Sequence, residues 1–343
     1  MSAVAMRDDL AIGVDIGGTK VAAGVVDPSG EILYHTRNPM VSNESAAQGL
    51  AAVTTAIEAA SAYTARVAGE HNLIRGIGIC SPGPVNPKAG VVVNPPNLPC
   101  WRNFPLAAEV AQIYRVRVKL DNDANAAGLA EALWGSGRGY RNVFYFTVGT
   151  GIGSGIVFDQ RIYHGRTGAA GEGGHVSIDY KGPRCGCGKP GCIEALASGP
   201  AIARRARAKL EHGRVSSLLD LAEGKLDRIT CEMVGTAASA GDAAANEVLQ
   251  ETLDLLSYWL GNIIDLLEPD VMIMGGGVGS MLKPYLEQIR DRLPVSCVNQ
   301  RCQEIPLITA RYGEDSGIAG GAALCVAPAE ENDIRNEPAL GQS

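Results

Sequence analysis

One pattern of strands and glycines occurs twice in this chain, near the N-terminus and again near the middle. Short β-branched runs at 11–15 and 21–27 flank the glycines Gly17 and Gly18. The runs 142–148 and 154–159 flank a second glycine-rich turn in the same order. Because short β-rich runs bounded by glycine are typical of strands joined by tight turns, both copies predict the same supersecondary unit. The repeat predicts two lobes of similar design.

Helical stretches alternate with further strands around both copies, which indicates an α/β fold. The run 31–37 completes a three-stranded meander, and more strands are predicted at 73–80, 116–120 and 270–274. Helices are predicted at 44–69, 124–134, 199–210 and 243–267, with a further helical segment at 281–293. We expect a small lobe over residues 1–120, onto which a C-terminal helix at about 315–327 packs, a large lobe over 121–314, and a disordered tail at 328–343.

Composition excludes several classes of protein. The 343 residues carry a formal net charge of −7, so the chain has no basic footprint for nucleic acid. No apolar run reaches the roughly 18 residues of a membrane span, and the first residues lack the apolar core of a signal peptide. We therefore expect a cytoplasmic protein. In a reducing compartment most of the nine cysteines are ordinary small apolar residues, and only three of them are arranged as a group.

The two glycine-rich turns are predicted to bind phosphate. In the turn from Asp15 to Lys20 and in the turn 149–155, positions without a side chain let backbone N–H groups approach an anion closely. The hydroxyls of Thr19 and Thr150 add donors. Neither turn has the P-loop or the dinucleotide pattern, which requires a helix directly after the glycines. One turn alone is explained equally well as a tight hairpin, whereas two equivalent turns favour a triphosphate, with Asp15 as an outer ligand of Mg²⁺.

A third glycine cluster, at 275–279, follows a predicted strand and precedes a helical segment. Bare backbone at this point offers a surface on which a nucleotide base and ribose can lie. A strand-to-helix turn whose glycines are needed for packing explains the cluster nearly as well.

Asp121, Asn122 and Asp123 lie where the strand 116–120 ends and the helix 124–134 begins. Polar side chains at the carboxyl end of a strand face the ligand crevice of an α/β sheet, and Asp or Asn is also a good helix N-cap there. A cap accounts for one acidic residue and leaves the other, with Asn122, available to a ligand. In phosphoryl transfer to a hydroxyl, a carboxylate accepts the hydroxyl proton. A purely structural role is the alternative, and the companion motifs favour catalysis.

His175 and three cysteines have a spacing that can close around a tetrahedral zinc ion. The cysteines are Cys185, Cys187 and Cys192, and the glycines between them permit the sharp turns that a metal knuckle needs. Free thiols or a strained disulfide are the alternative, and a cytosolic location disfavours the disulfide. A shell of one histidine and three cysteines has no open position for water. We therefore expect structural zinc and exclude a zinc-dependent hydrolase.

Two glutamates flank this predicted metal site. Glu172 precedes His175, and Glu194 follows Cys192. If one nitrogen of His175 binds zinc, the other can hydrogen-bond a substrate hydroxyl while both carboxylates converge on the same space. Acceptor carboxylates beside a polarised imidazole are suited to binding a polyol. The alternative is that both glutamates are solvated loop charges.

Taken together, these motifs resemble those of the ROK family of bacterial sugar kinases and sugar-responsive repressors. The stretch from Val148 to His175 resembles the family signature, and the Cys-Gly-Cys-Gly block at 185–194 resembles its zinc motif. The resemblance covers about residues 11–326. It implies a two-lobed α/β fold of the actin/hexokinase/Hsp70 (ribonuclease H-like) type, with the active site in a cleft between the lobes.

The same resemblance implies roles for single residues, with Asp123 as the general base. The implied sugar contacts are Asn97, Asn122, Asp123, Glu172, His175 and Glu194. The implied nucleotide contacts are Asp15, Gly17, Gly18, Thr19, Lys20, Gly149, Thr150, Gly151, Gly153, Gly275, Gly276 and Gly277. The implied ligands of structural Zn²⁺ are His175, Cys185, Cys187 and Cys192.

Within the family, the intact zinc motif, both glycine turns and the run 194–199 look most like glucokinases. The implied activity is transfer of the γ-phosphoryl group of Mg-ATP to the 6-hydroxyl of glucose. Kinases for N-acetylglucosamine or N-acetylmannosamine share nearly every motif and remain an alternative, as does a non-catalytic sugar sensor. We do not expect the DNA-binding layout of the repressors, because the first strand starts near residue 10. The resemblance implies a homodimer or a tetramer, and leaves open whether polyphosphate can replace ATP.

Overall fold

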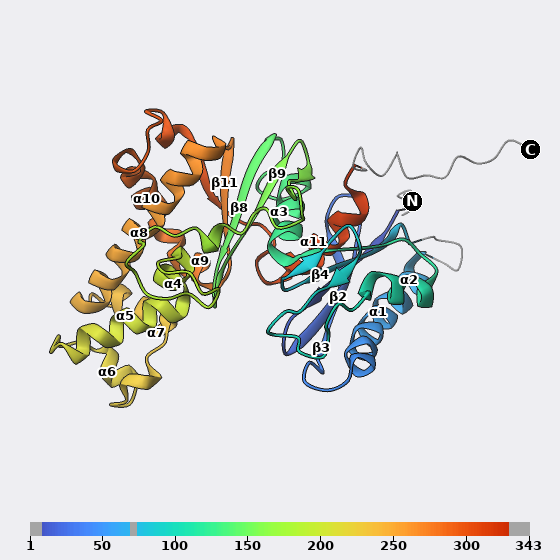
Figure 1. Ribbon diagram of the computed structural model, residues 1–343, viewed down its shortest axis with the longest axis horizontal. Helices are drawn as coiled ribbons and strands as arrows, with labels where there is room; N and C mark the ends of the chain where they lie inside the picture. Colours follow the sequence, from blue (N-terminus) through green and yellow to red (C-terminus); the bar gives the residue numbers. More distant parts are fainter. Residues whose placement is uncertain (1–8, 69–73, 329–343) are drawn as a thin grey trace, which may run out of the picture. The chain divides into compact units, whose positions relative to one another are not determined.

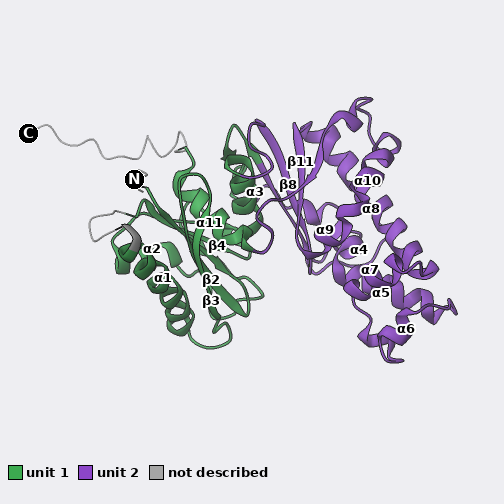
Figure 2. Cartoon of the chain, turned by 180° about the vertical axis from the view of Figure 1, so that it is seen from behind, with its two compact units in different colours: residues 1–134, 157–168, 315–343 green, residues 135–156, 169–314 purple. Residues whose placement is uncertain are grey.

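The structure is a computed structural model that describes residues 9–68 and 74–328. The chain divides into two compact units, which Figure 2 shows in different colours. The first unit contains residues 1–134, 157–168 and 315–343, and the second contains 135–156 and 169–314. Each unit is built around a β-sheet with helices packed on it (Figure 1).

The sheet of the first unit has the strand order β3-β2-β1-β4-β7. Its strands are β1 (Ala11–Ile16), β2 (Lys20–Val26), β3 (Ile32–Pro39), β4 (Gly76–Ser81) and β7 (Val118–Asn122). The strands β1 to β3 form an antiparallel meander, and β4 and β7 continue the sheet in parallel with β1. The predicted meander is therefore confirmed. Parallel order brings the carboxyl ends of β1, β4 and β7 to one edge, which is where ligands bind in such sheets.

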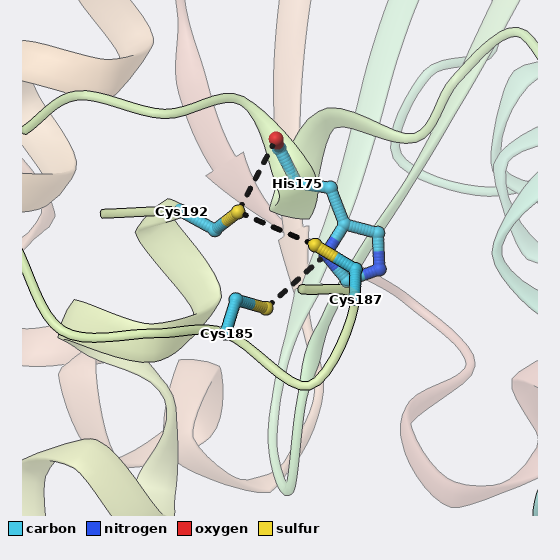
Figure 3. A group of neighbouring side chains, drawn as sticks. All are labelled: His175, Cys185, Cys187 and Cys192. Atoms are coloured by element: carbon cyan, nitrogen blue, oxygen red, sulfur yellow. Dashed lines mark hydrogen bonds between the residues drawn. The ribbon is translucent and has the colours of Figure 1, made fainter. Parts of the chain in front are cut away.

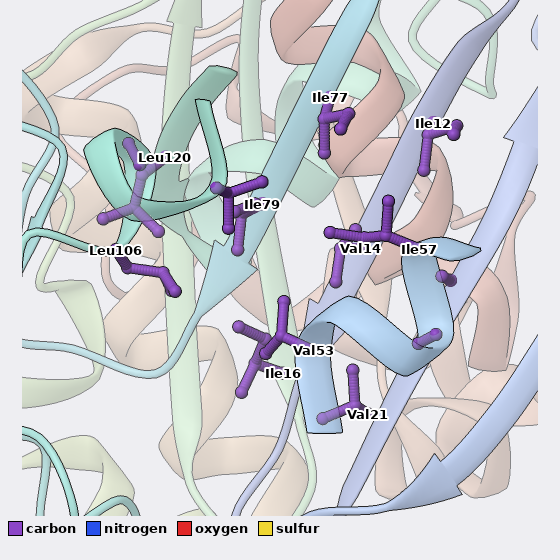
Figure 4. Close-up of a cluster of buried hydrophobic side chains, with 14 of the residues drawn as sticks. Ile12, Val14, Ile16, Val21, Val53, Ile57, Ile77, Ile79, Leu106 and Leu120 are labelled. Carbon is purple, nitrogen blue, oxygen red and sulfur yellow. The ribbon is translucent and has the colours of Figure 1, made fainter. Parts of the chain in front are cut away.

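One face of this sheet carries a hydrophobic core covered by helix α1 (Ala46–Ala68). The alternation of β1 and β4 directs every second side chain to this face. Figure 4 shows these side chains meeting the helix; they include Ile12, Val14, Ile16, Ile77 and Ile79 of the strands and Val53 and Ile57 of α1.

The opposite face of the sheet carries a row of glycines on which helix α11 (Ser316–Val326) packs. Gly13 of β1 is paired with Gly24 of β2 and with Gly78 of β4. A Cβ atom at Gly13 would lie 1.8 Å from the carbonyl oxygen of Ile318, and one at Gly78 would lie 1.7 Å from that of Gly321. The absence of side chains therefore lets the backbone of α11 lie directly against the sheet.

The first unit also contains shorter elements. They are the hairpin of β5 (Val85–Asn86) and β6 (Val91–Val92), helices α2 (Leu106–Tyr114) and α3 (Asp123–Leu133), and β10 (Arg161–Ile162), which pairs with the end of the strand β9 (Ile152–Phe158). The helix α2 was not predicted.

The sheet of the second unit contains β8 (Asn142–Val148), β9 (Ile152–Phe158), β11 (Val271–Gly275) and β12 (Leu307–Thr309), and β10 extends it at the edge, in the order β10-β9-β8-β11-β12. The long helix α8 (Ala243–Leu267) inserts Trp259 against the sheet, with its ring centroid 5.8 Å from that of Phe144 and 5.4 Å from that of Phe146. The other helices are α4 (Ile193–Ala197), α5 (Gly199–Glu211), α6 (Leu218–Leu221), α7 (Cys231–Ser239), α9 (Gly277–Leu282) and α10 (Leu286–Arg292).

Most predicted elements of this unit are confirmed within two residues, including α5, α8, β8 and β11. The single helical segment predicted at 281–293 is instead divided between α9 and α10. Pro284 lies at the division, where its missing N–H and fixed φ favour a short 3-10 turn. The strand β12 and the helix α7 were not predicted.

No helix among the described residues is both long enough and apolar enough to cross a membrane. Most of the tail that was expected to be disordered, from residue 329 onward, lies outside the described residues.

Candidate functional site

The turn from β7 into α3 carries Asp121, Asn122 and Asp123. The side-chain oxygen of Asn122 is the N-cap of α3, accepting the N–H groups of Ala124 at 2.9 Å and Asn125 at 3.4 Å. Asp123 is the first residue of the helix, and its carboxylate is exposed. One of these three residues caps the helix, as expected, but it is Asn122, which the sequence analysis left for a ligand, and not one of the two carboxylates. This leaves an exposed carboxylate at the carboxyl edge of the sheet.

Asp121 holds this turn from the buried side. Its carboxylate is 2% exposed and accepts the N–H of Asn122 at 2.7 Å and the side-chain amide of Asn125 at 3.1 Å. The other oxygen lies 2.6 Å from Nε2 of His164. A buried carboxylate requires such partners because burying an unpaired charge is strongly unfavourable. The sequence analysis gave no role to His164, since nothing local relates two residues 43 positions apart.

The first glycine turn connects β1 and β2. The N–H of Gly17 donates to the carbonyl of Lys20 at 2.8 Å, and Thr19 and Lys20 are exposed. A Cβ atom at Gly18 would lie 3.0 Å from the carbonyl oxygen of Asn97. The fold therefore brings one predicted sugar contact against the predicted phosphate turn.

Asp15 lies near the end of β1, within electrostatic reach of Asp123. Burial raises the pKa of Asp15 to about 6, the negative charge of Asp123 raises it as well, and Arg37 opposes the rise. The carboxylates of Asp15 and Asp123 repel each other, and this repulsion contributes to the raised pKa of Asp15. A divalent cation between them would stabilise both negative charges.

The second glycine turn and the third glycine cluster lie side by side in the second unit. The N–H of Gly149 donates to the carbonyl of Gly151 at 2.9 Å, and the N–H of Gly199 donates to Gly149 at 2.8 Å. Gly276 has a φ of +86°, and a Cβ atom there would lie 2.3 Å from the carbonyl oxygen of Val148. Only glycine satisfies both conditions, so the two motifs form one glycine-lined surface.

A cavity of about 500 Å³ adjoins this surface. It is lined by Gly277, Val278 and Met281 around α9, and by Cys231, Glu232, Gly235, Thr236 and Ser239 of α7. Its volume is in the range of small-molecule sites. The contribution of α7 was missed by the sequence analysis, because its pattern contains no motif and only its packing brings it beside Gly277.

The predicted metal ligands converge. The ligand atoms of His175, Cys185, Cys187 and Cys192 all lie within 4.8 Å of one another. Figure 3 shows the three sulfur atoms and the imidazole facing a common centre. The Sγ atoms of Cys187 and Cys192 are 3.6 Å apart, and Sγ of Cys185 is 3.6 Å from Nδ1 of His175. Tetrahedral zinc with Zn–S bonds of about 2.3 Å places neighbouring sulfurs about 3.8 Å apart, so these residues fit the ion.

The orientation of His175 separates its two nitrogens. Nδ1 faces the cysteines, whereas Nε2 lies 4.0 Å from the carboxylate of Glu172. Glu194 lies on the cysteine side, 3.9 Å from Nδ1, and its other oxygen accepts the N–H of Ile152 at 3.0 Å. These three predicted sugar contacts therefore form one group beside the second glycine turn.

Two residues that the sequence analysis did not single out hold the loop of Glu172 and His175. The hydroxyl of Ser154 donates to the carbonyl of Gly171 at 2.6 Å and accepts the N–H of Gly173 at 3.0 Å. The indole of Trp259 donates to the carbonyl of Gly173 at 3.0 Å. The loop is thus bonded to β9 and α8, which gives it a defined position.

The predicted site residues fall into two sets. Asp15 to Lys20, Asn97, Asn122 and Asp123 belong to the first unit, whereas Glu172, His175, Glu194 and the other two glycine motifs belong to the second. Within each unit, the members of the set lie close together. A cleft that combines both sets stays a prediction of the sequence analysis.

The sheet of each unit and its covering helices define a two-lobed α/β protein of the actin-like class, and solved structures of that class bear this out. The structure is similar to the crystal structure of a ROK family glucokinase from Streptomyces griseus in complex with glucose and AMPPNP, with a TM-score of 0.76 and 34% sequence identity. The match covers 92% of this chain and 98% of that chain. The expected fold class is confirmed.

The chain belongs to the ROK family, whose model matches residues 11–327. It is 36% identical over 322 residues to a glucokinase of Streptomyces coelicolor, with 93% of this chain and 98% of the relative covered. It is also 31% identical over 326 residues to an N-acetyl-D-glucosamine kinase of Yersinia pseudotuberculosis, with 92% and 98% covered.

Proposed function

We propose that the protein is an ATP-dependent glucokinase that phosphorylates the 6-hydroxyl of glucose. The observation that carries the proposal is the 36% identity to a glucokinase across 93% of the chain. The geometry of both residue sets is consistent with it. A sensor that had lost its chemistry would be expected to lack one of these groups, and none of them is missing.

In this proposal Asp123 accepts the proton of the attacking hydroxyl. Its exposed carboxylate stands at the N-terminus of α3, where the turn is held by the cap of Asn122 and by the buried Asp121. The 6-oxygen forms a bond to the γ-phosphorus as the bond to the β-γ bridging oxygen breaks, and ADP leaves. A fixed carboxylate contributes by having its acceptor oxygen in place before reaction.

The nucleotide is assigned to the three glycine motifs. The turns 15–20 and 149–155 donate backbone N–H groups to the phosphates, and the cavity beside Gly277 takes the adenosine. Asp15 is proposed as an outer ligand of Mg²⁺, which would neutralise phosphate charge. The raised pKa of Asp15 supports this role, because a nearby cation relieves the cost of its charge.

The sugar is assigned to Asn97, Asn122, Glu172, His175 and Glu194, with zinc as a structural support. The ion would hold Nδ1 of His175 and leave Nε2 directed toward the hydroxyls of the sugar. The four ligands complete a tetrahedral shell, so no water can be activated there.

The experiment measures ADP release by the purified protein with Mg-ATP and five sugars: glucose, mannose, fructose, N-acetylglucosamine and N-acetylmannosamine. A kcat/KM for glucose at least tenfold above the others is expected. Preference for an N-acetylated sugar would keep the mechanism and replace the named substrate, as the relative from Yersinia pseudotuberculosis suggests. Sugar binding without turnover would support the sensor instead.

Two finer points belong to the same proposal. Measuring formation of the sugar phosphate with polyphosphate in place of ATP decides the phosphoryl donor, for which ATP is proposed. A homodimer is proposed from family resemblance, and sedimentation velocity at several protein concentrations tests it.

A further inference from the structure

His164 forms a hydrogen bond with Asp121 that joins two distant segments of the first unit. Nε2 of His164 lies 2.6 Å from Oδ2 of Asp121, and the two side chains are 14% and 3% exposed. A carboxylate oxygen accepts hydrogen bonds, so Nε2 is the donor. Because Asp121 is buried, an oxygen that loses this donor would have no water to replace it, which is costly.

The hairpin of β9 and β10 brings His164 to this position. Its two central residues, Asp159 and Gln160, have φ values of +49° and +62°, as a tight two-residue turn requires. The strand β10 packs on α3, and His164 follows β10 by two residues. Gly165, with a φ of +67°, then gives the chain a left-handed turn. The hairpin and this turn therefore place the imidazole at the end of β7.

The carboxylate of Asp121 connects His164 to the turn that carries Asp123. Its other oxygen accepts the N–H of Asn122 at 2.7 Å and the side-chain amide of Asn125 at 3.1 Å. Asn122 is the cap of α3, and Asp123 is the first residue of that helix. One carboxylate therefore holds the loop after β10, the cap and the first turn of α3 together.

The segment that begins at His164 continues into the loop that carries two proposed sugar contacts. The chain passes from the first unit to the second after residue 168. Glu172 and His175 follow, and hydrogen bonds to β9 and α8 fix this loop at its far end. The bond of His164 fixes the near end of the same segment.

His164 and Asp121 also lie in the wall of a cavity of about 330 Å³ in the first unit. The rest of the wall comes from the loop after β5, from β7 and β10, and from the end of α11. Free space beside the imidazole lets another side chain of similar size be accommodated there without overpacking. Substitutions of His164 are therefore expected to fold.

We propose that His164 is a positioning residue for phosphoryl transfer, which holds the turn of Asp123 in place through Asp121. This inference rests on the proposed function, in which Asp123 accepts the hydroxyl proton. His164 touches no reacting atom in this proposal. Its removal should therefore lower kcat by displacing the base, and should change the binding of sugar and nucleotide much less.

Steady-state ADP release with glucose and Mg-ATP tests the proposal on two variants. His164→Leu removes the donor and should lower kcat about 10–100-fold, with both KM values within about threefold of wild type. His164→Gln keeps an N–H donor and should keep kcat within about threefold. His212→Leu is the matched control, because His212 is an exposed histidine bonded only to a carbonyl of its own helix, and it should behave as wild type.

A double variant separates positioning from a general loss of structure. Because His164 acts through Asp123, adding His164→Leu to Asp123→Asn should lower kcat by less than about twofold further. A further loss of about tenfold would overturn the proposal, since His164 would then act by a route that does not include Asp123. Equal losses in His164→Leu and His164→Gln would also overturn it.

Amide hydrogen exchange tests the same contact without turnover. Exchange in peptides that cover 121–126 should be at least about fivefold faster in His164→Leu than in wild type, and unchanged in His212→Leu. Unchanged exchange in His164→Leu would overturn the proposal, as would an unchanged kcat. If the wild type phosphorylates no sugar, the proposed function fails, and the exchange rates still decide whether His164 holds the turn. His164→Ala takes the place of His164→Leu if thermal melting shows the latter to be unfolded.

Discussion

Three adjacent side chains at the end of β7 have three different functions. Asn122 caps α3, Asp121 holds the turn from its buried side, and Asp123 presents an exposed carboxylate. Burial and hydrogen bonding thus give three chemically similar neighbours different functions. Only Asp123 has the accessibility that a base for a substrate hydroxyl needs.

Asp123→Asn is expected to lower kcat by roughly 10²–10⁴-fold, because the amide keeps the size of the side chain but cannot accept the proton. Glucose affinity should change much less. Steady-state ADP release and calorimetry with glucose measure the two effects. Glu211→Gln, an exposed acidic residue of α5, is the matched control and should behave as wild type. A kcat within twofold of wild type for Asp123→Asn would remove the residue as base.

Asp15→Asn is expected to stabilise the fold while abolishing most activity. The pKa of Asp15 is raised from 3.8 to about 6, first by burial and then by Asp123. The folded state therefore binds the proton more tightly than the unfolded state. Ionisation destabilises the fold fully above pH about 6, and this cost disappears below pH about 4. The variant should gain about 1–3 kcal/mol in free energy of unfolding at pH 8.

Urea denaturation of wild type and Asp15→Asn at pH 5 and pH 8 measures this gain. It should be smaller at pH 5, where part of the wild-type carboxyl is already protonated. Equal gains at both pH values would contradict the raised pKa.

At the scale of elements, the fold depends on how closely α11 approaches β1, β2 and β4. The glycine row formed by Gly13, Gly24 and Gly78 is continuous across three strands because the strand register places these residues opposite one another. Gly317 of α11 lies against Asp15, since a Cβ atom there would be 2.2 Å from the carboxyl carbon. The position of α11 therefore also defines the surroundings of Asp15.

Gly78→Ala is expected to lower the free energy of unfolding by about 2–3 kcal/mol or more, because its Cβ would lie 1.7 Å from the carbonyl oxygen of Gly321. Thermal and urea denaturation measure the loss. Gly277→Ala is the control: it is a helical glycine with nothing within 4 Å of a built Cβ, and it should be neutral or slightly stabilising. Equal stability of the two variants would show that α11 does not pack as closely as described.

The metal loop is the second element on which the proposed site depends. Cys187→Ser should release zinc and weaken glucose affinity about 10–100-fold, because the ion orients His175. Nucleotide binding should remain within about twofold of wild type, since none of the four zinc ligands belongs to the glycine motifs. Elemental analysis and calorimetry check both effects, with Cys297→Ser as a cysteine control outside the cluster. Retained zinc with normal glucose affinity would refute the assignment.

At the scale of the whole molecule, each unit contributes one set of predicted site residues. The proposed reaction needs both sets around one substrate pair, and closure would exclude water as a competing phosphoryl acceptor. Glucose is therefore expected to reduce the radius of gyration measured by small-angle X-ray scattering. A sugar that the protein neither binds nor phosphorylates serves as the control. An unchanged radius at saturating glucose would contradict closure. The expected domain boundary near residue 120 likewise stays a prediction, which limited proteolysis can test.

Much of this architecture could be predicted from local sequence. The meander, the helices α1, α3, α5 and α8, and the convergence of the four metal ligands all depend on residues a short distance apart. Period-2 alternation, glycine turns and cysteine spacing encode such features directly, because their physical causes are steric and act between near neighbours. The prediction of a single helical segment over 281–293 was wrong for a similarly local reason, because Pro284 lacks an N–H group and interrupts the helix between α9 and α10.

The sequence by itself determined the fold class, the family and the identity of the motifs. Only the tertiary structure decided that Asn122 rather than a carboxylate caps α3, and that His164 is bonded to Asp121. It also decided that α7 lines the cavity beside Gly277 and that cations from three separate segments line another cavity. These features arise where segments distant in the chain are packed together. Their energies depend on burial and on partners that no local pattern specifies.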